Sequence, residues 1–185
     1  MRAVGIGALV VLVVLALGLL FGAYSLAQQQ VALEGYRGDV WTQVDRASQL
    51  LERLEGQLEY GVKELSQINE QIVTARSDIL AAQKAKDLEA ALAATDQAQL
   101  AIDVMIEAYP QYFDMTEVFE GLQDETAGSF NRITYARKDL IDAQVRFNQT
   151  RITFFPLAGL FDREEVIGSG FDPTSSVAPS TLGGQ

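Results

Sequence analysis

The chain begins with a long run of apolar residues. Residues 3–23 include no charged residue. A helix that rises about 1.5 Å per residue spans roughly 31 Å over that length, which matches the hydrocarbon thickness of a bilayer. Tyr24 follows where an aromatic side chain is expected at the membrane–water interface. The pattern predicts a transmembrane anchor over residues 1–30, with residues 3–23 in contact with the membrane.

A cleavable signal peptide is the alternative to an anchor. Signal peptides carry an apolar stretch of about 7–15 residues followed by a small-x-small site. Ser25-Leu26-Ala27 meets the last requirement, and cleavage after Ala27 would release a secreted, soluble bundle. We favour the retained single-pass anchor because the apolar run is longer than a signal peptide needs. Arg2 precedes the run and the next basic residue is Arg37, so the positive-inside rule places the body outside the cytoplasm.

After residue 30, apolar residues recur at the three- and four-residue spacing of helices. The first helix continues from the anchor along the stripe Val40, Val44, Ala47 and Leu51. A second stripe, of coiled-coil type, follows at Leu54, Leu58, Val62, Leu65, Ile68, Ile72, Ala75, Ile79 and Ala82. Glycine costs up to about 1 kcal/mol in a helix, so we place the turn between these two helices near Gly56. One continuous helix is the alternative.

Two more helices complete the predicted body. Asp87 is a suitable N-cap for the third helix, and Pro110 ends it. The fourth opens near Asp114 or Thr116 and ends at Phe154-Phe155-Pro156. No segment has the alternation of a strand.

The predicted fold class is all-α. Short connections between long helices are typical of antiparallel neighbours, so residues 31–161 are predicted to form an antiparallel bundle of long helices. Residues 162–185 are rich in Gly, Ser and Pro and hold few apolar residues, which predicts a disordered tail. The seam of the second helix is expected to pack within its own chain.

Composition narrows the chemistry of the body. The chain has 14 basic and 25 acidic residues and a net charge of −11, which excludes nucleic acid as a partner. It has no histidine and no cysteine, so triad catalysis and the usual zinc and iron–sulfur sites are closed to it. A carboxylate-based enzyme, or a metal-dependent component of an envelope complex, is the remaining catalytic alternative. We expect no enzyme activity and no cofactor, because neighbouring carboxylates such as Asp124-Glu125 do not face each other on a helix.

Short motifs stand in a recognisable order along the chain. The last helix and its flanks carry Leu122-Gln123-Asp124-Glu125, Asn131-Arg132-Ile133, Ala136-Arg137, Phe147-Asn148 and Phe155-Pro156, preceded by Tyr109-Pro110. Further upstream stand Trp41-Thr42-Gln43-Val44 and Thr74-Ala75-Arg76. Over residues 1–161 this order and spacing resemble the LemA family of membrane-anchored bacterial proteins. The LIPNL turn of that family is missing, and Leu51 to Gln57 stand in its place.

The resemblance implies an anchored bundle of long antiparallel helices with no established enzymatic activity. Members of the family occur beside membrane-associated peptidases or TPM-domain proteins, and relatives serve magnetosome membranes. By resemblance, we expect an interaction or scaffolding module at the cell envelope, with other envelope proteins as its partners.

Two sets of residues are candidates for such contacts. Gly18 and Gly22 form a GxxxG pair, a spacing that lets two membrane helices approach closely and predicts a homo-oligomer. The ordinary glycine content of membrane helices is the alternative reading. A polar cluster on the last helix is the candidate partner-binding site: Gln123, Asn131, Arg132 and Arg137. Its alternative is a set of arginines whose stems pack along the core while their charges stay in water.

Overall fold

The computed structural model describes residues 2–59, 65–109, 117–154 and 159–167. These residues form α1 (Arg2–Glu59), α2 (Ser66–Ala85), α3 (Leu88–Ala108) and α5 (Glu117–Thr153). Within these ranges there is no strand, so the predicted all-α class is confirmed. The predicted end of the third helix before Pro110 is confirmed as well, whereas Asp114 and Thr116 lie outside the described residues.

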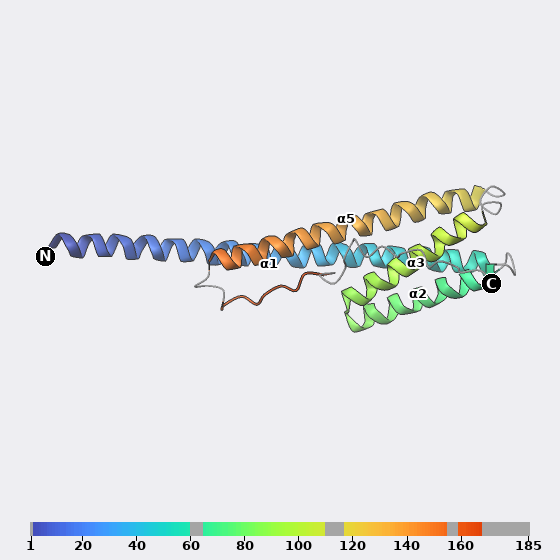
Figure 1. The fold of residues 1–185 in the computed structure, drawn as a ribbon, viewed down its shortest axis with the longest axis horizontal. Helices are drawn as coiled ribbons and strands as arrows, with labels where there is room; N and C mark the ends of the chain where they lie inside the picture. The colour runs from blue at the N-terminus through green and yellow to red at the C-terminus, as the bar shows by residue number, and fades with distance from the viewer. Residues whose placement is uncertain (1, 60–64, 110–116, 155–158, 168–185) are drawn as a thin grey trace, which may run out of the picture.

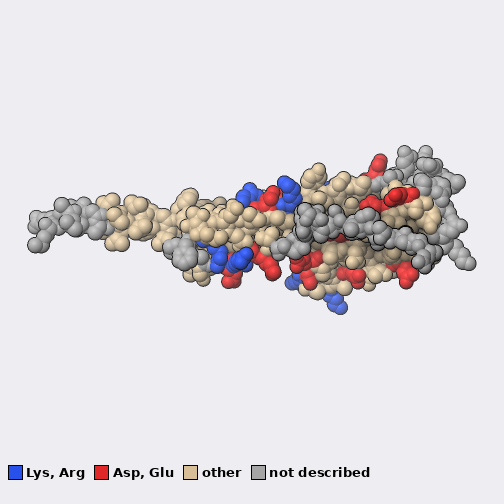
Figure 2. All heavy atoms as spheres, viewed as in Figure 1, with Lys and Arg blue, Asp and Glu red and all other residues tan. Residues whose placement is uncertain are grey.

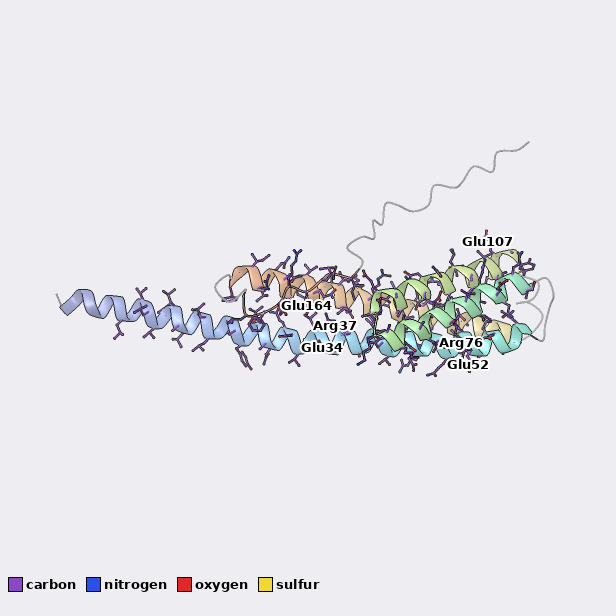
Figure 3. All side chains as sticks on the ribbon, turned by 90° about the horizontal axis from the view of Figure 1, so that it is seen from below. Glu34, Arg37, Glu52, Arg76, Glu107 and Glu164 are labelled. Atoms are coloured by element: carbon purple, nitrogen blue, oxygen red, sulfur yellow. The ribbon has the colours of Figure 1, made fainter. Side chains whose placement is uncertain are left out.

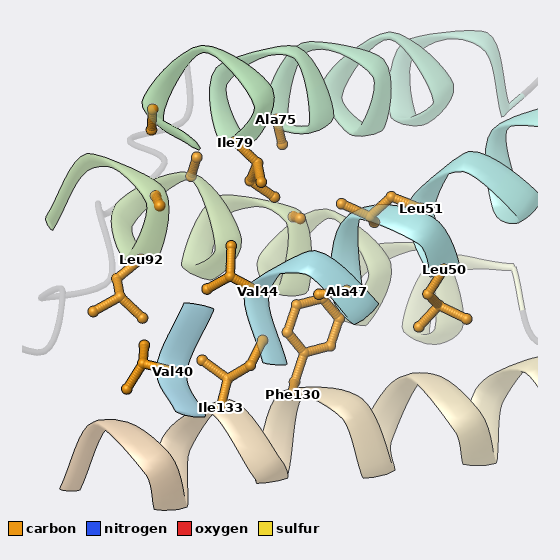
Figure 4. Close-up of a cluster of buried hydrophobic side chains, with 14 of the residues drawn as sticks. Val40, Val44, Ala47, Leu50, Leu51, Ala75, Ile79, Leu92, Phe130 and Ile133 are labelled. Carbon is orange, nitrogen blue, oxygen red and sulfur yellow. The ribbon is translucent and has the colours of Figure 1, made fainter. Parts of the chain in front are cut away.

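Helix α1 is the central element of the body. Its first part projects alone as a rod, α5 runs antiparallel along the remainder, and the α2–α3 hairpin covers another side of the far half (Figure 1). In the core, Val40, Val44 and Ala47 of α1 lie between α5 and the hairpin (Figure 4). Val40, Val44, Ala47 and Leu51 are each 0 % exposed, so the predicted stripe is the buried face of α1.

The predicted turn near Gly56 is wrong. Helix α1 runs through Gly56 and ends at Glu59. Gly56 is exposed, and nothing lies within 4 Å of where its Cβ would be, so it contributes no packing. Leu54 and Leu58 on either side are buried, and burying a leucine is worth about 1.5–3 kcal/mol, more than the glycine costs. The coiled-coil stripe is therefore divided between α1 and α2, and both parts face the core of their own chain.

The turn between α2 and α3 is closed by capping at both helix ends. Lys86 adopts a left-handed conformation with φ 57°, and its N–H and that of Asp87 donate to the carbonyls of Gln83 and Ala82. The Asp87 carboxylate then accepts from the backbone N–H of Ala90 at 3.0 Å, which confirms Asp87 as the N-cap of α3. These bonds hold α2 and α3 side by side as a hairpin.

The packed body extends beyond residues 31–161 at both ends. Leu26, within the predicted anchor, is 0 % exposed, and Gln29 Nε2 donates to Thr150 Oγ1 of α5 at 3.2 Å. Residues 162–167, predicted as part of the disordered tail, lie against α5 and are held by hydrogen bonds described below. Residues 168–185 of that predicted tail lie outside the described residues.

Candidate functional site: a groove between α3 and α5

An open groove separates α3 from α5 along the outside of the bundle. It consists of two hollows of about 320 Å³ and about 590 Å³ that share Gln99 and Asp103 of α3. Ile102, Ile106 and Phe130 line the smaller hollow, and Leu100 and Ile141 line the larger one. Helices α3 and α5 each pack against α1, and the described residues leave the space between α3 and α5 open.

Two of the four residues of the predicted polar cluster line this groove. Asn131 lies in the smaller hollow and Arg137 in the larger one. Arg132, which is exposed, lines neither hollow. The side chain of Gln123 lies outside the described residues. The structure thus groups Asn131 with Arg137 and separates Arg132 from them.

Acidic residues of α3 face this side of α5. Arg137 Nη1 pairs with Asp96 Oδ2 at 3.1 Å across the groove, and its side chain is 23 % exposed. Asp103 and Glu107 line the smaller hollow and form no ion pair with any described residue; Glu107 lies near the far end of the bundle in Figure 3. A negatively charged hollow with an apolar floor suits a partner's apolar side chain beside a basic one. The sequence prediction missed Asp96, Asp103 and Glu107 because they lie on α3, whereas the predicted cluster was sought along α5 alone.

The groove is entered by an extended segment, residues 159–167, which we call the strap. Asn148 of α5 bonds both backbone groups of Glu164: its Nδ2 donates to the carbonyl at 2.8 Å, and its Oδ1 accepts from the N–H at 3.1 Å. Gln144, four residues earlier and 1 % exposed, donates to the carbonyl of Glu165 at 2.9 Å and accepts from the N–H of Ile167 at 3.2 Å. Ile167 lines the larger hollow, so the strap leads into the groove.

Side chains complete the attachment of the strap. Arg37 of α1 lies between Glu34 and Glu164 and pairs with both (Figure 3). Arg151 Nε donates to the carbonyl of Phe161 at 2.7 Å, and the Phe161 ring meets Phe147 edge-on at a centroid distance of 6.5 Å. The strap is therefore a built part of the α1–α5 surface.

A second polar contact joins the two halves of the body. Arg76, in the Thr74-Ala75-Arg76 motif of α2, pairs with Glu52 at 3.1 Å and with Glu55 at 2.9 Å, both on α1. Its side chain is 23 % exposed, and Figure 3 places it between the helices. This motif residue therefore positions α2 on α1. Among the described residues, no three acidic side chains lie close enough together to hold a metal ion.

The two glycines of the GxxxG pair have different surroundings. Gly22 is buried, and a Cβ there would lie 2.5 Å from Cδ1 of Phe154 at the end of α5. At Gly18 nothing lies within 4 Å of a built Cβ. The absence of a side chain at Gly22 thus makes room for Phe154 at the end of α5 of the same chain. Of the two glycines, Gly18 is the one with open space beside it within the described residues. The predicted homo-oligomer stays a prediction.

The rod formed by the first part of α1 is apolar on all sides. Among the described residues, α1 is the single helix long and apolar enough to cross a membrane, by a criterion that a signal sequence also meets. Within the described part of the chain, its large apolar side chains are 38–69 % exposed: Leu9, Val10, Val11, Leu12, Val13, Val14, Leu15, Leu17, Leu19, Leu20 and Phe21.

These features define a class, that of helical-bundle proteins with an apolar N-terminal rod continuous with the bundle. The model of the LemA family matches residues 37–162, which is more than half of the chain. The protein belongs to the LemA family, as its motifs predicted. The matched range contains α1 from Arg37 onward and all of α2, α3 and α5, whereas the buried Leu26 and Leu33 of α1 precede it. No curated protein matches the chain.

Proposed function

We propose that the protein is a single-pass membrane protein whose helical body is a non-catalytic interaction module at the cell envelope. The observation that carries this proposal is the continuity of α1, which is exposed and apolar from Leu9 to Phe21 and then buried on one face to Leu58. One unbroken helix leaves no flexible joint between the rod and the body. The body would therefore be held upright, at a fixed distance from the bilayer.

The packing of residues 22–27 supports a retained anchor over a signal peptide. Cleavage after Ala27 would remove Leu26, a fully buried core residue, and Gly22, which lies under Phe154. Losing a buried leucine side chain costs about 2–5 kcal/mol even when only the side chain is truncated. A mature chain that begins at Gln28 would leave the end of α5 without its partner.

The surface proposed for partners is the groove between α3 and α5. Its apolar floor and the acidic side chains Asp103 and Glu107 favour a protein segment that presents an apolar residue next to a basic one. By the positive-inside rule the body lies outside the cytoplasm, where other envelope proteins are the available partners.

Membrane extraction tests the proposed anchor. After an alkaline wash of isolated membranes, the full chain should stay in the membrane fraction with its N-terminus intact. Recovery of a soluble chain that begins at Gln28 would contradict the anchor.

Binding in the groove is tested by photo-crosslinking. A photoreactive residue in place of Leu100, which is 65 % exposed and lines the larger hollow, should crosslink to a defined membrane neighbour. Tyr135, 69 % exposed on α5 and outside the groove, is the matched control. Equal products from both positions would contradict a binding site in the groove, and products of twice the chain mass from Leu100 would identify a second copy as the partner.

A further inference from the structure

The end of α5 lies beside the last part of the predicted membrane-contacting run. Phe154 packs over Gly22, and Gly22 belongs to residues 3–23. Because that run matches the hydrocarbon thickness, its last residues are where the chain leaves the hydrocarbon core. Phe154 therefore lies at the same depth as the boundary between hydrocarbon and headgroups.

The side chains around this contact are apolar and exposed. Ile152 on α5 is 70 % exposed and Leu160 on the strap is 74 % exposed. On α1, Phe21 and Tyr24, which flank Gly22 in the sequence, are 69 % and 64 % exposed. Residues 155–158, which connect α5 to the strap, read Phe-Pro-Leu-Ala and lie outside the described residues. Exposed apolar side chains of α1 and of the end of α5 therefore lie close to the level of the Gly22–Phe154 contact.

We propose that this tip, defined by Ile152, Phe154 and Leu160, enters the membrane interface next to α1. The protein then contacts lipid at two places: the span itself and the tip of α5. This inference rests on the proposed anchoring of α1. It commits to lipid as the occupant because the patch adjoins the span, at a depth where aromatic and aliphatic side chains replace water contacts with lipid contacts.

One basic side chain lies above the tip, on a strap whose Asp162 and Glu165 are exposed acidic residues. Arg163 on the strap is exposed and forms no ion pair with any described residue. Its neighbour Glu164 is bound by Asn148, six residues before Phe154, so Arg163 lies about 9 Å above the boundary. The headgroup layer is about 5–8 Å thick, within reach of an arginine side chain at that height. On the face shown in Figure 2, Lys and Arg lie next to the rod and in the middle of the molecule, and Asp and Glu extend to the far end.

The absence of cysteine allows a direct test on the full-length protein in liposomes. Single cysteines are introduced by Ile152→Cys and Leu160→Cys, labelled with the polarity-sensitive fluorophore NBD, and compared with Tyr135→Cys and Leu12→Cys. All four positions are 64–74 % exposed, so labelling leaves the core intact. We expect blue-shifted NBD emission at positions 152 and 160, with quenching by lipids that carry a nitroxide near the headgroup.

The two control positions separate the inference from the proposed anchor. Position 135 should emit as in water, and position 12 should be quenched most by a nitroxide deep in the acyl chain. Water-like emission at 152 and 160, together with quenching at 12, would overturn the tip contact and leave the anchor standing. Absence of quenching at 12 would overturn both.

Discussion

The α1–α5 pair and the α2–α3 hairpin are built from side chains of different size. Along the α1–α5 pair many buried residues are large: Leu26, Leu33, Leu140 and Phe147 are each 0–1 % exposed. The buried residues of the hairpin include six alanines: Ala75, Ala82, Ala91, Ala94, Ala98 and Ala101. Large side chains bury more apolar area per residue, whereas alanines let two helix backbones approach closely.

This difference suggests that the two halves of the body contribute differently to its stability and to the shape of the groove. We infer that the α1–α5 pair supplies the larger share of the stabilisation of the body, since α1 and α5 hold seven of the twelve largest fully buried side chains; the hairpin holds the other five, Ile72, Ile79, Leu92, Ile102 and Met105. The hairpin adds the second wall of the groove, and its position depends on close alanine packing and on the caps at Lys86 and Asp87.

Truncating the largest side chain in the α1–α5 pair should have the largest effect. Phe147→Ala removes a ring that is 1 % exposed and packs edge-on against Phe161, which should lower the free energy of unfolding by about 3–5 kcal/mol. Urea unfolding in detergent, followed by circular dichroism, measures this loss. The exposed control Tyr135→Ala should change stability by less than about 0.5 kcal/mol. Similar losses in the two variants would contradict the buried packing of Phe147 between α5 and the strap.

Enlarging an alanine should disturb the hairpin instead. Ala98→Leu places three extra carbons where the side chain is 0 % exposed, and overpacking of this kind costs about 1–3 kcal/mol. Ala93→Leu, at an exposed position on the same helix, is the matched control. The same unfolding experiment applies, and an unchanged stability for Ala98→Leu would show that the helices are not closely packed there.

The contact between Gly22 and Phe154 should respond to a similar change. Gly22→Leu forces Phe154 away, which should cost about 1–3 kcal/mol and speed hydrogen exchange in the last turn of α5. Gly18→Leu should leave that exchange unchanged, because the space beside Gly18 is open within this chain. A GxxxG dimer would instead be weakened by both substitutions, which analytical ultracentrifugation in detergent reports.

Removing the cap of α3 should have a smaller effect that is confined to the hairpin. Asp87→Ala frees the N–H of Ala90 and should cost about 1 kcal/mol. Hydrogen exchange should rise at the start of α3 and stay unchanged in α5. Asp78→Ala, at an exposed site inside α2, serves as the control. Faster exchange throughout the body after Asp87→Ala would contradict the separation of the two halves.

The smallest effect is expected for the exposed ion pair between α1 and α5. Arg53 Nη2 lies 2.6 Å from Glu125 Oε1, with side chains 56 % and 50 % exposed. A double-mutant cycle with Arg53→Gln and Glu125→Gln should give a coupling of about 0.2–1 kcal/mol, which falls as salt is added. A coupling that salt leaves unchanged would indicate a pair shielded from solvent.

Periodicity predicted the helices and the buried face of α1 well, because burial repeats with the helix turn. It placed the α1–α2 turn wrongly near Gly56, since the local cost of one glycine was outweighed by the packing of Leu54 and Leu58. Of the four residues predicted as a polar cluster, two lie in the groove. Asn131 and Arg137 share the groove, but Arg132 points elsewhere on the same helix, and the opposite wall with Asp96 and Asp103 is brought there only by the tertiary fold.

The strap shows why a family resemblance can end before the folded chain does. Gln144 and Asn148 recognise its main chain through amides that both donate and accept, so substitutions among residues 163–167 would leave those bonds in place. Only proline at position 164 or 167 would remove a donor. These main-chain bonds extend the folded architecture to residue 167, five residues beyond the end of the family match at 162.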